Sequence, residues 1–258
     1  MKNILVCMKA VPASTQLSLD GEQTLQREKL SLQWNIADEA ALEAALRLRA
    51  PGGTVTVLTM GPGKLEEPLR QLLGRGADRA ILLSDPSLSG ADTWATARAL
   101  SAAVRTLGEF DLILCGRRAV DGETGQVPPM LASALDIPCI TNAEHLEEEE
   151  GKLTLCRRLE TAAVTLTVEG AAVVSLCEYS YPLRLPGILA MRRAREKQVQ
   201  YLTAADLGLA PKECGLKGSL TKVVHTDKKF PGLRSGKKET NISAAAGKLL
   251  EMCREVRG

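Results

Sequence analysis

Residues 110–131 read FDLILCGRRAVDGETGQVPPML, and the fold can be worked out from this stretch. Its first six residues are mostly apolar, which is typical of a buried β-strand, while Pro128 and Pro129 suit the first turn of a helix. Between strand and helix lies a row of glycine, acidic, hydroxyl and amide residues, 121–126. At the carboxyl end of a strand, such a row indicates either an ordinary strand-to-helix turn or a ligand site.

Apolar runs and helical spacings alternate along the first half of the chain. Strands are predicted at residues 4–8, 55–60, 80–83 and 112–115, and helices at 38–49, 65–73 and 91–107. This alternation predicts an α/β fold of the Rossmann-like nucleotide-binding type, with a mostly parallel sheet and helices on both faces. Residues 17–26 alternate around Asp20 and Gly21, which predicts a hairpin inserted after the first strand.

The second half of the chain has a different texture. Residues 153–176 predict further strands, antiparallel at first, and residues 242–256 predict a helix. Because residues 214–239 contain few large apolar side chains, we interpret them either as an extended arm that lies on a partner or as a flexible tail. We therefore expect a nucleotide-binding α/β domain over 1–210 and a C-terminal arm and helix over 211–258.

Composition excludes several classes of function. The formal net charge is +2 and aromatic residues make up 3% of the chain, which gives no basis for nucleic-acid binding. No apolar run is long enough for membrane insertion. The seven cysteines are scattered and never spaced C-x-x-C, which predicts no metal site and a cytoplasmic location. His145 and His225 lie in polar surroundings and are predicted to be surface residues, so we expect no catalytic residues.

The predicted parallel sheet favours a ligand site at residues 121–126. Ligands of open parallel sheets lie beyond the carboxyl ends of the strands, where residues 7–9, 33–38, 60–63 and 121–127 are predicted to gather. The first turn of the helix after this loop offers N–H groups that suit a phosphate. Neither G-x-G-x-x-G nor G-x-x-x-x-G-K-[ST] occurs, which argues against an NAD-type Rossmann enzyme and a P-loop NTPase.

Individual residues in these segments have expected roles. Gly122 and Gly125 allow the backbone to turn sharply, and Thr124 is expected to cap the following helix. Asn35 and Asp38 offer donors and acceptors that could read a base or a ribose. These expectations predict a nucleotide-binding module.

Six motifs in order resemble the beta (small) subunit of electron transfer flavoproteins, over essentially the whole chain. They are ILVCMKAVP (4–12), NIADEAALEAALRL (35–48), GADRAILLSD (76–85), LILCGRRAVDGETGQVPPMLASALDIP (112–138), LRLPGILAMRRAREK (183–197) and GLKGSLTKVV (215–224). The stretch between Val174 and Leu185 is shorter than the family's and lacks its usual Asn-Glu-Pro.

The resemblance implies an electron carrier subunit and no enzyme of its own. Such subunits form a heterodimer with an alpha subunit around an FAD, and they shuttle electrons between an acyl-CoA dehydrogenase-type flavoenzyme and another redox protein. The beta-subunit site then holds AMP or a second FAD. In the electron-bifurcating subclass NADH reduces that FAD, and ferredoxin or flavodoxin is the low-potential acceptor. Residues 122–127 are similar to the version in bifurcating members, which favours FAD.

The resemblance also assigns site residues. It implies that the nucleotide is held by Cys7, Asn35, Asp38, Met60, Asp121, Gly122, Glu123, Thr124, Gly125, Gln126 and Val127. It implies that a loop over 181–190 recognises the partner through Leu185, Pro186 and Ile188, with the basic run 192–197 beside it. Two alternatives remain open: a stand-alone AMP- or ATP-binding regulatory module of the stress-protein type, and an ATP-pyrophosphatase-like enzyme.

Overall fold

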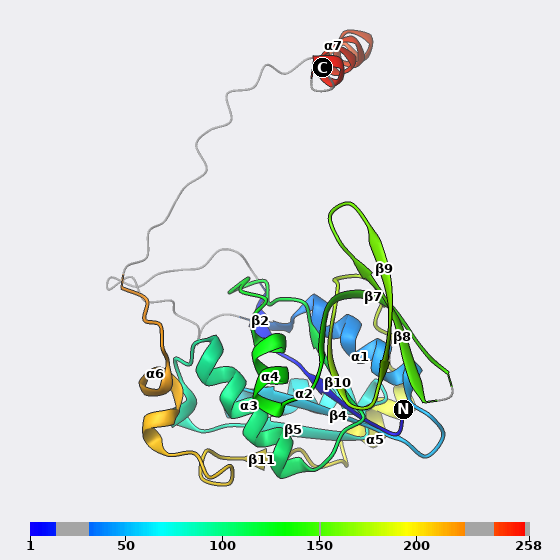
Figure 1. Cartoon of the computed structure of the whole chain (residues 1–258). Helices are drawn as coiled ribbons and strands as arrows, with labels where there is room; N and C mark the ends of the chain where they lie inside the picture. Colours follow the sequence, from blue (N-terminus) through cyan, green and yellow to red (C-terminus); the bar gives the residue numbers. More distant parts are fainter. Residues whose placement is uncertain (14–30, 150, 225–239, 256–258) are drawn as a thin grey trace. The chain divides into compact units, whose positions relative to one another are not determined.

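The computed structural model describes residues 1–13, 31–149, 151–224 and 240–255, and divides the chain into two units, Met1–Lys222 and Val223–Gly258 (Figure 1). The hairpin predicted at 17–26 lies outside the described residues. The helices are α1 (Ile36–Leu48), α2 (Glu66–Gly74), α3 (Thr93–Leu107), α4 (Val127–Leu135), α5 (Ile188–Ala194), α6 (Gly215–Gly218) and α7 (Ile242–Glu255).

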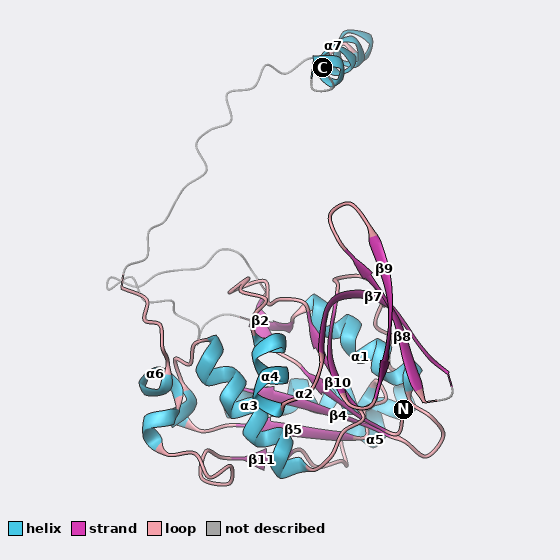
Figure 2. Cartoon of the chain, viewed as in Figure 1, coloured by secondary structure: helices cyan, strands magenta, loops and turns pink. Residues whose placement is uncertain are grey.

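Strands form one large sheet and one small sheet (Figure 2). The large sheet contains β1 (Asn3–Cys7), β4 (Thr54–Met60), β5 (Arg79–Leu83), β6 (Leu112–Gly116), β7 (Cys139–Glu149), β8 (Lys152–Arg158), β9 (Ala163–Glu169), β10 (Ala172–Leu176) and β11 (Gln200–Leu202). Its order is β11-β5-β4-β1-β6-β10-β7-β8-β9, and the pairs from β11 to β7 are parallel while β7, β8 and β9 pair antiparallel. The short strands β2 (Ala10–Pro12) and β3 (Leu32–Trp34) form the small antiparallel sheet. The predicted fold class is confirmed.

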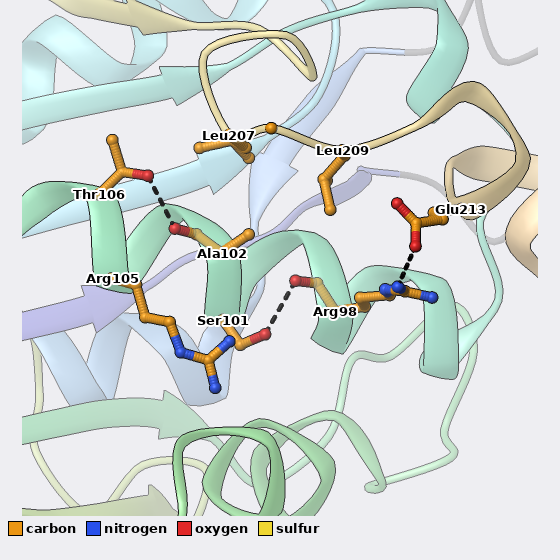
Figure 3. Close-up of a pocket in the computed structure, with 9 residues that line it drawn as sticks. Arg98, Ser101, Ala102, Arg105, Thr106, Leu207, Leu209 and Glu213 are labelled. Atoms are coloured by element: carbon orange, nitrogen blue, oxygen red, sulfur yellow. Dashed lines mark hydrogen bonds and ion pairs between the residues drawn. The ribbon is translucent and has the colours of Figure 1, made fainter.

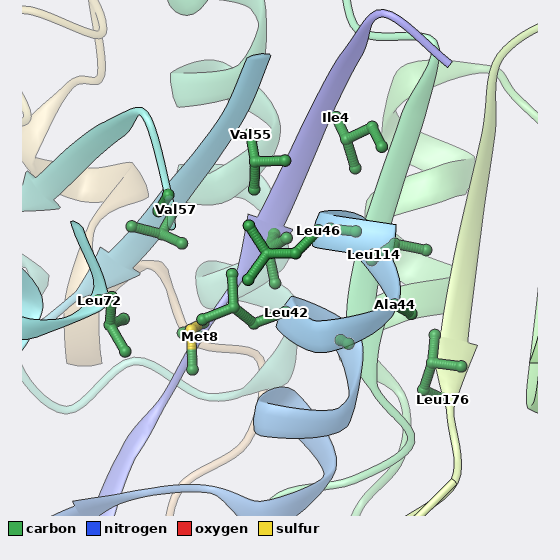
Figure 4. Close-up of a cluster of buried hydrophobic side chains, with 14 of the residues drawn as sticks. Ile4, Met8, Leu42, Ala44, Leu46, Val55, Val57, Leu72, Leu114 and Leu176 are labelled. Carbon is green, nitrogen blue, oxygen red and sulfur yellow. The ribbon is translucent and has the colours of Figure 1, made fainter. Parts of the chain in front are cut away.

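Two apolar cores lie on opposite faces of the large sheet. Because side chains alternate along a strand, Ile4 and Val6 of β1 join the core under α1 and α2, while Leu5 and Cys7 join the core under α3 and α4. Figure 4 shows Leu42 of α1 in the first of these cores, among side chains of the neighbouring strands. Helices therefore cover both faces, as the sequence predicts.

Some elements differ from the prediction. The predicted strands at 153–176 are present as β8, β9 and β10, and β8 and β9 pair antiparallel as expected, whereas β10 lies parallel between β6 and β7, a position that the sequence does not predict. β7 and β11 were not predicted. The expected arm does not begin extended, because Cys214 is buried and α6 follows it directly.

The first unit continues past residue 210 to Lys222. Glu213 forms an ion pair with Arg98 of α3, and Asp92 accepts hydrogen bonds from the backbone N–H and hydroxyl of Thr221, both at 2.9 Å. These contacts hold residues up to Lys222 on the first unit. In the second unit, the predicted helix is present as α7, and it exposes apolar side chains at Ile242, Leu249, Leu250 and Met252.

Candidate functional site

The sheet reverses its strand order beside β1. β1 pairs with β4 on one side and with β6 on the other, so the connections from β1 and from β6 leave the same carboxyl edge in opposite directions. In open parallel sheets this point is where a crevice forms and ligands bind. The loop after β1 and the loop after β6 meet here, with the start of α1 beneath them.

Asp38 fastens the two loops to each other. Its carboxylate accepts the backbone N–H of Lys9, after β1, at 2.7 Å and that of Gly116, at the end of β6, at 2.9 Å. The side chain is 6% exposed. Burial raises the pKa of Asp38 to about 7, and hydrogen bonds from Lys9, Asn35 and Gly116 limit that rise.

Asn35 performs a similar task one turn earlier. It stands at the N-cap of α1, yet its side chain caps no N–H of that helix. Instead its Nδ2 donates to the carbonyl of Arg118 at 2.9 Å, and its Oδ1 accepts the N–H of Val120 at 3.2 Å. Asn35 is 1% exposed. Together, Asn35 and Asp38 bond the backbone at the end of β6 and in the loop after it, at Gly116, Arg118 and Val120. The side chains predicted to read a base or ribose are thus bonded to loop backbone.

An ion pair joins the loop after β1 to the loop after β6. Lys9 Nζ lies 2.6 Å from Asp121 Oδ1, so the lysine that follows β1 meets the first acidic residue of the row after β6. This contact shows what Asp121 does in the structure. The sequence motifs contained Lys9 but gave no reason to pair it with Asp121.

The rest of the loop is an exposed turn. Glu123 and Gly125 have positive φ angles of 50° and 63°, whereas Gly122 does not, so the sharp turns fall at Glu123 and Gly125. The expectation that Thr124 caps α4 is wrong, because α4 begins at Val127 with Gln126 at its N-cap and no side-chain cap. The Thr124 hydroxyl accepts only a long bond of 3.5 Å from the Gln126 N–H.

Three predicted residues take part in packing. Cys7 is buried beside Cys115 on the neighbouring strand, and the hydrogen bond between the two thiols, together with burial, raises the pKa of the Cys115 thiol. Met60, at the end of β4, and Val127, at the start of α4, are partly buried against the same core. Cys7 and Met60 end their strands at the carboxyl edge, where the Cys7 side chain is buried and the Met60 side chain is partly buried.

A cavity of about 440 Å³ adjoins the loop on the side of β7. Asn142, with a φ of 60°, stands in its wall where the register between β7 and β10 is interrupted. Arg117 Nη2 lies 3.0 Å from Glu178, while Arg118 makes only long ion pairs, 3.5 Å to Glu178 and 3.8 Å to Glu123. The sequence contains both arginines in its most characteristic block, but sequence reasoning did not assign them.

Glu178 is held as an anion by these arginines. Burial would raise the pKa of Glu178, but hydrogen bonds from its own backbone N–H and from Arg117 outweigh burial and keep the pKa below its usual value. The cavity wall carries the guanidinium groups of Arg117 and Arg118 and one carboxylate, that of the exposed Glu123, while Glu178 contacts both arginines from outside the lining. Chemically, the loop and this wall can bind an anion.

A second hollow, of about 480 Å³, lies along α3 and is separate from this edge (Figure 3). Its polar side chains are already bonded: Arg98 to Glu213, Arg105 to the carbonyl of Ala134, and Ser101 to the carbonyl of Arg98. Since these bonds occupy its charged groups, we assign no ligand to this hollow.

The predicted recognition loop presents apolar side chains to solvent. Leu185 is 87% exposed and Ile188 is 89% exposed, Leu189 beside them is 69% exposed, and Pro186 is half-buried. Monomeric surfaces rarely expose neighbouring large apolar residues in this way, and such patches mark interaction sites. The basic run begins in α5, at Arg192 and Arg193.

The described part of the chain meets neither the needs of a metal cluster nor those of a membrane-spanning helix. No group of three or more potential metal-ligating side chains occurs there, and none of the helices described is long and apolar enough to cross a membrane. His145 is exposed and contacts Glu147, as predicted for a surface residue, while His225 lies outside the described residues.

Comparison with known proteins identifies relatives across the chain. Residues 24–207 match the electron transfer flavoprotein domain family. The chain is 43% identical to the electron transfer flavoprotein subunit beta of Thermoanaerobacterium thermosaccharolyticum, over 87% of both chains. It is 37% identical to the subunit beta of Megasphaera elsdenii, over 85% of both chains. It is 34% identical to the caffeyl-CoA reductase-Etf complex subunit CarD of Acetobacterium woodii, over 98% of both chains.

Proposed function

The chain belongs to the electron transfer flavoprotein family as a beta subunit, and from this premise we propose that its carboxyl-edge site holds the adenosine and phosphates of an FAD. Subunits of this family are electron carriers that pair with an alpha subunit. The observation that carries the proposal is the loop after β6, which Asn35 and Asp38 fasten to the point where the strand order reverses.

The charged groups around the loop suit a phosphate. The Arg118 side chain is 40% exposed and makes only long ion pairs, so its guanidinium is free to turn to a bound phosphate. A second cation, Lys9, lies on the loop after β1. The start of α4 adds only the backbone N–H of Val127, because Pro128 and Pro129 have no N–H and the Met130 N–H is bonded to the carbonyl of Gln126. Asp121 keeps its pair with Lys9 or accepts from a ribose hydroxyl, because its charge opposes a phosphate.

FAD is favoured over AMP on two grounds. Residues 122–127 resemble the version of the loop in bifurcating members, and the cavity of about 440 Å³ beside the loop offers room beyond the phosphates. When bound, FAD would supply redox chemistry that accepts electrons from NADH and passes them to an acyl-CoA dehydrogenase-type flavoenzyme and to ferredoxin or flavodoxin. The chain's own residues bind and orient it, and they supply no catalytic group.

Counting the cofactors of the purified heterodimer tests this proposal. We expect denaturation to release two FAD per heterodimer, and we expect NADH to bleach the flavin absorbance before denaturation. Replacing Arg118 with glutamine, which removes the loosely paired cation, should reduce the content of the second FAD and leave the first unchanged. One FAD and one AMP per heterodimer, with no bleaching by NADH, would contradict the proposal.

We also propose that the loop with Leu185 and Ile188 docks an acyl-CoA dehydrogenase-type flavoenzyme. The exposed apolar side chains suit an apolar pocket, and the basic run beside them suits an acidic rim that steers the encounter. The relative from Acetobacterium woodii is named as part of a complex with a caffeyl-CoA reductase, which supports a partner that acts on CoA esters. A stand-alone regulatory module is not favoured, because relatives match the chain nearly from end to end.

The C-terminal unit is proposed to lie on the alpha subunit. A chain that ends at Lys222 should bind the alpha subunit at least about tenfold more weakly, since burying even one of the exposed leucines of α7 is worth about 1.5 kcal/mol or more. The dissociation constant of the heterodimer measures this. The unfolding midpoint of the first unit is the control and should not change. Equal affinity of the shortened and complete chains would contradict the role of the arm.

A further inference from the structure

We propose that Glu43 is a positioning residue for partner docking. From α1 it holds the main chain at Arg184, and it thereby fixes the orientation of the exposed Leu185 side chain. This inference rests on the docking role proposed for the loop. Glu43 and Leu185 lie in two of the motifs that resemble the family, but the resemblance assigns no role to Glu43.

Glu43 binds the residue immediately before Leu185 at three atoms. Its carboxylate accepts the backbone N–H of Arg184 at 3.1 Å, the Nε of the same arginine at 2.9 Å and its Nη2 at 3.0 Å. The two guanidinium bonds form a planar, bidentate pair, the geometry that an arginine holds most rigidly. Because the backbone N–H is bonded as well, the main chain is fixed one residue before the exposed leucine.

Other contacts also hold the chain just before Leu185. The carbonyl of Arg184 accepts a bond of 3.5 Å from Arg75, so both peptide groups of that residue are held. Three residues earlier, the Tyr181 hydroxyl accepts the N–H of Leu146 in β7 at 2.7 Å. Arg47 of α1 lies over the Tyr181 ring, 5.3 Å from its centre, and donates to Glu43 at 2.8 Å.

The far end of the exposed segment is fixed too. Ala194 of α5 is buried, and Met191 packs against Gly74 of α2 closely enough that a β-carbon there would collide with it. Arg70 of α2 donates to the carbonyls of Arg195 and Lys197. Residues 185–189 therefore form a short exposed segment between two anchored ends, and Glu43 holds the nearer end.

The charge of Glu43 is better explained by positioning than by stability. Its side chain is 3% exposed, and burial would raise the pKa of Glu43, but the bonds from Arg184 and Arg47 outweigh burial and lower it. Buried ion pairs replaced by apolar residues often leave stability unchanged or improved. An apolar side chain would, however, leave the start of the loop free, and ordering it during docking would weaken binding.

The three bonds from Arg184 to Glu43 form a clamp, and two measurements on the full heterodimer test it. Glu43→Gln places an amide N–H₂ against the guanidinium, so amide hydrogen exchange at Arg184, whose N–H Glu43 accepts, should become about tenfold faster. Val104→Ala, in α3 on the opposite face of the sheet, is the control for lost stability and should leave exchange at Arg184 unchanged. Unchanged exchange in Glu43→Gln, or equal acceleration in the control, would overturn the proposal.

A double-mutant cycle then connects the clamp to docking. An acyl-CoA dehydrogenase-type enzyme that binds the wild-type heterodimer is the probe. Leu185→Ala should raise its Kd by about 30-fold, and Glu43→Gln by about tenfold. In the Leu185→Ala background Glu43→Gln should add less than about twofold, because the residue acts through Leu185. Fully multiplicative effects would overturn the proposal, whereas an unchanged Kd for Leu185→Ala would overturn the docking role and leave hydrogen exchange to decide the clamp.

Discussion

Replacing Gly116 with alanine is expected to lower the free energy of unfolding by about 3 kcal/mol, the upper end of the usual cost of overpacking. The new β-carbon would collide with Oδ1 of Asp38 and lie 2.8 Å from both the carbonyl carbon and the β-carbon of Ala37. α1 cannot retreat, because nine of its thirteen residues are buried. The collision therefore breaks the contact that fastens the loop, and denaturant unfolding measures the loss.

Gly122, in the same loop, is the matched control. A β-carbon there meets no atom within 4 Å, and its φ angle is not positive, so Gly122→Ala should change stability by less than about 0.5 kcal/mol. Nucleotide content should fall in Gly116→Ala and stay the same in Gly122→Ala. Equal unfolding curves for the two variants would contradict the close approach of α1 to the end of β6.

Asp38 is expected to make stability fall as pH rises towards neutrality. The pKa of its carboxyl is raised from 3.8 to about 7, so the folded chain keeps a proton that the unfolded chain loses. The stabilisation is complete below pH 4 and is lost as pH rises through 7. A shift of this size corresponds to about 4 kcal/mol over the whole window. Urea unfolding at pH 5 and pH 8 would detect most of it.

Asp38→Asn separates this contribution from those of other groups. Asparagine does not titrate, so the difference in stability between the wild-type protein and Asp38→Asn should shrink on going from pH 5 to pH 8. The variant should also be less stable at pH 5, because its amide nitrogen faces one of the two backbone N–H donors, of Lys9 or Gly116. A difference that does not vary with pH would show that Asp38 is ionised throughout.

Much of the fold could be predicted because its elements have strong local signals. The strands β1, β4, β5 and β6 are short apolar runs, and α1, α2 and α3 have helical spacing, so their positions follow from the sequence. β7 escapes prediction because its second half is a row of acidic residues, which suits an exposed strand paired on the sheet's antiparallel side. β11 has three residues, too few for a pattern.

The site could be predicted as a place but only partly as a set of contacts. Glycine and acidic residues mark the loop after β6, whereas the bonds of Asn35 and Asp38 depend on how α1 crosses beneath it. Thr124 does not cap the helix because α4 begins two residues later than a cap at that position requires. Glu43 and Arg184 are 141 positions apart, so only the folded chain brings them together.

The insertion of β10 between β6 and β7 determines when, during synthesis, the centre of the sheet can be completed. β6 pairs with β1 on one side and with β10 on the other, and β10 ends at Leu176, after the whole β7–β9 antiparallel segment. A nascent chain that has reached only residue 171 therefore carries β6, a strand buried along its whole length, with an open edge. Such edges are aggregation-prone until they are paired. During synthesis, the loop after β6 therefore gains its complete support only when β10 has been made and has paired with β6.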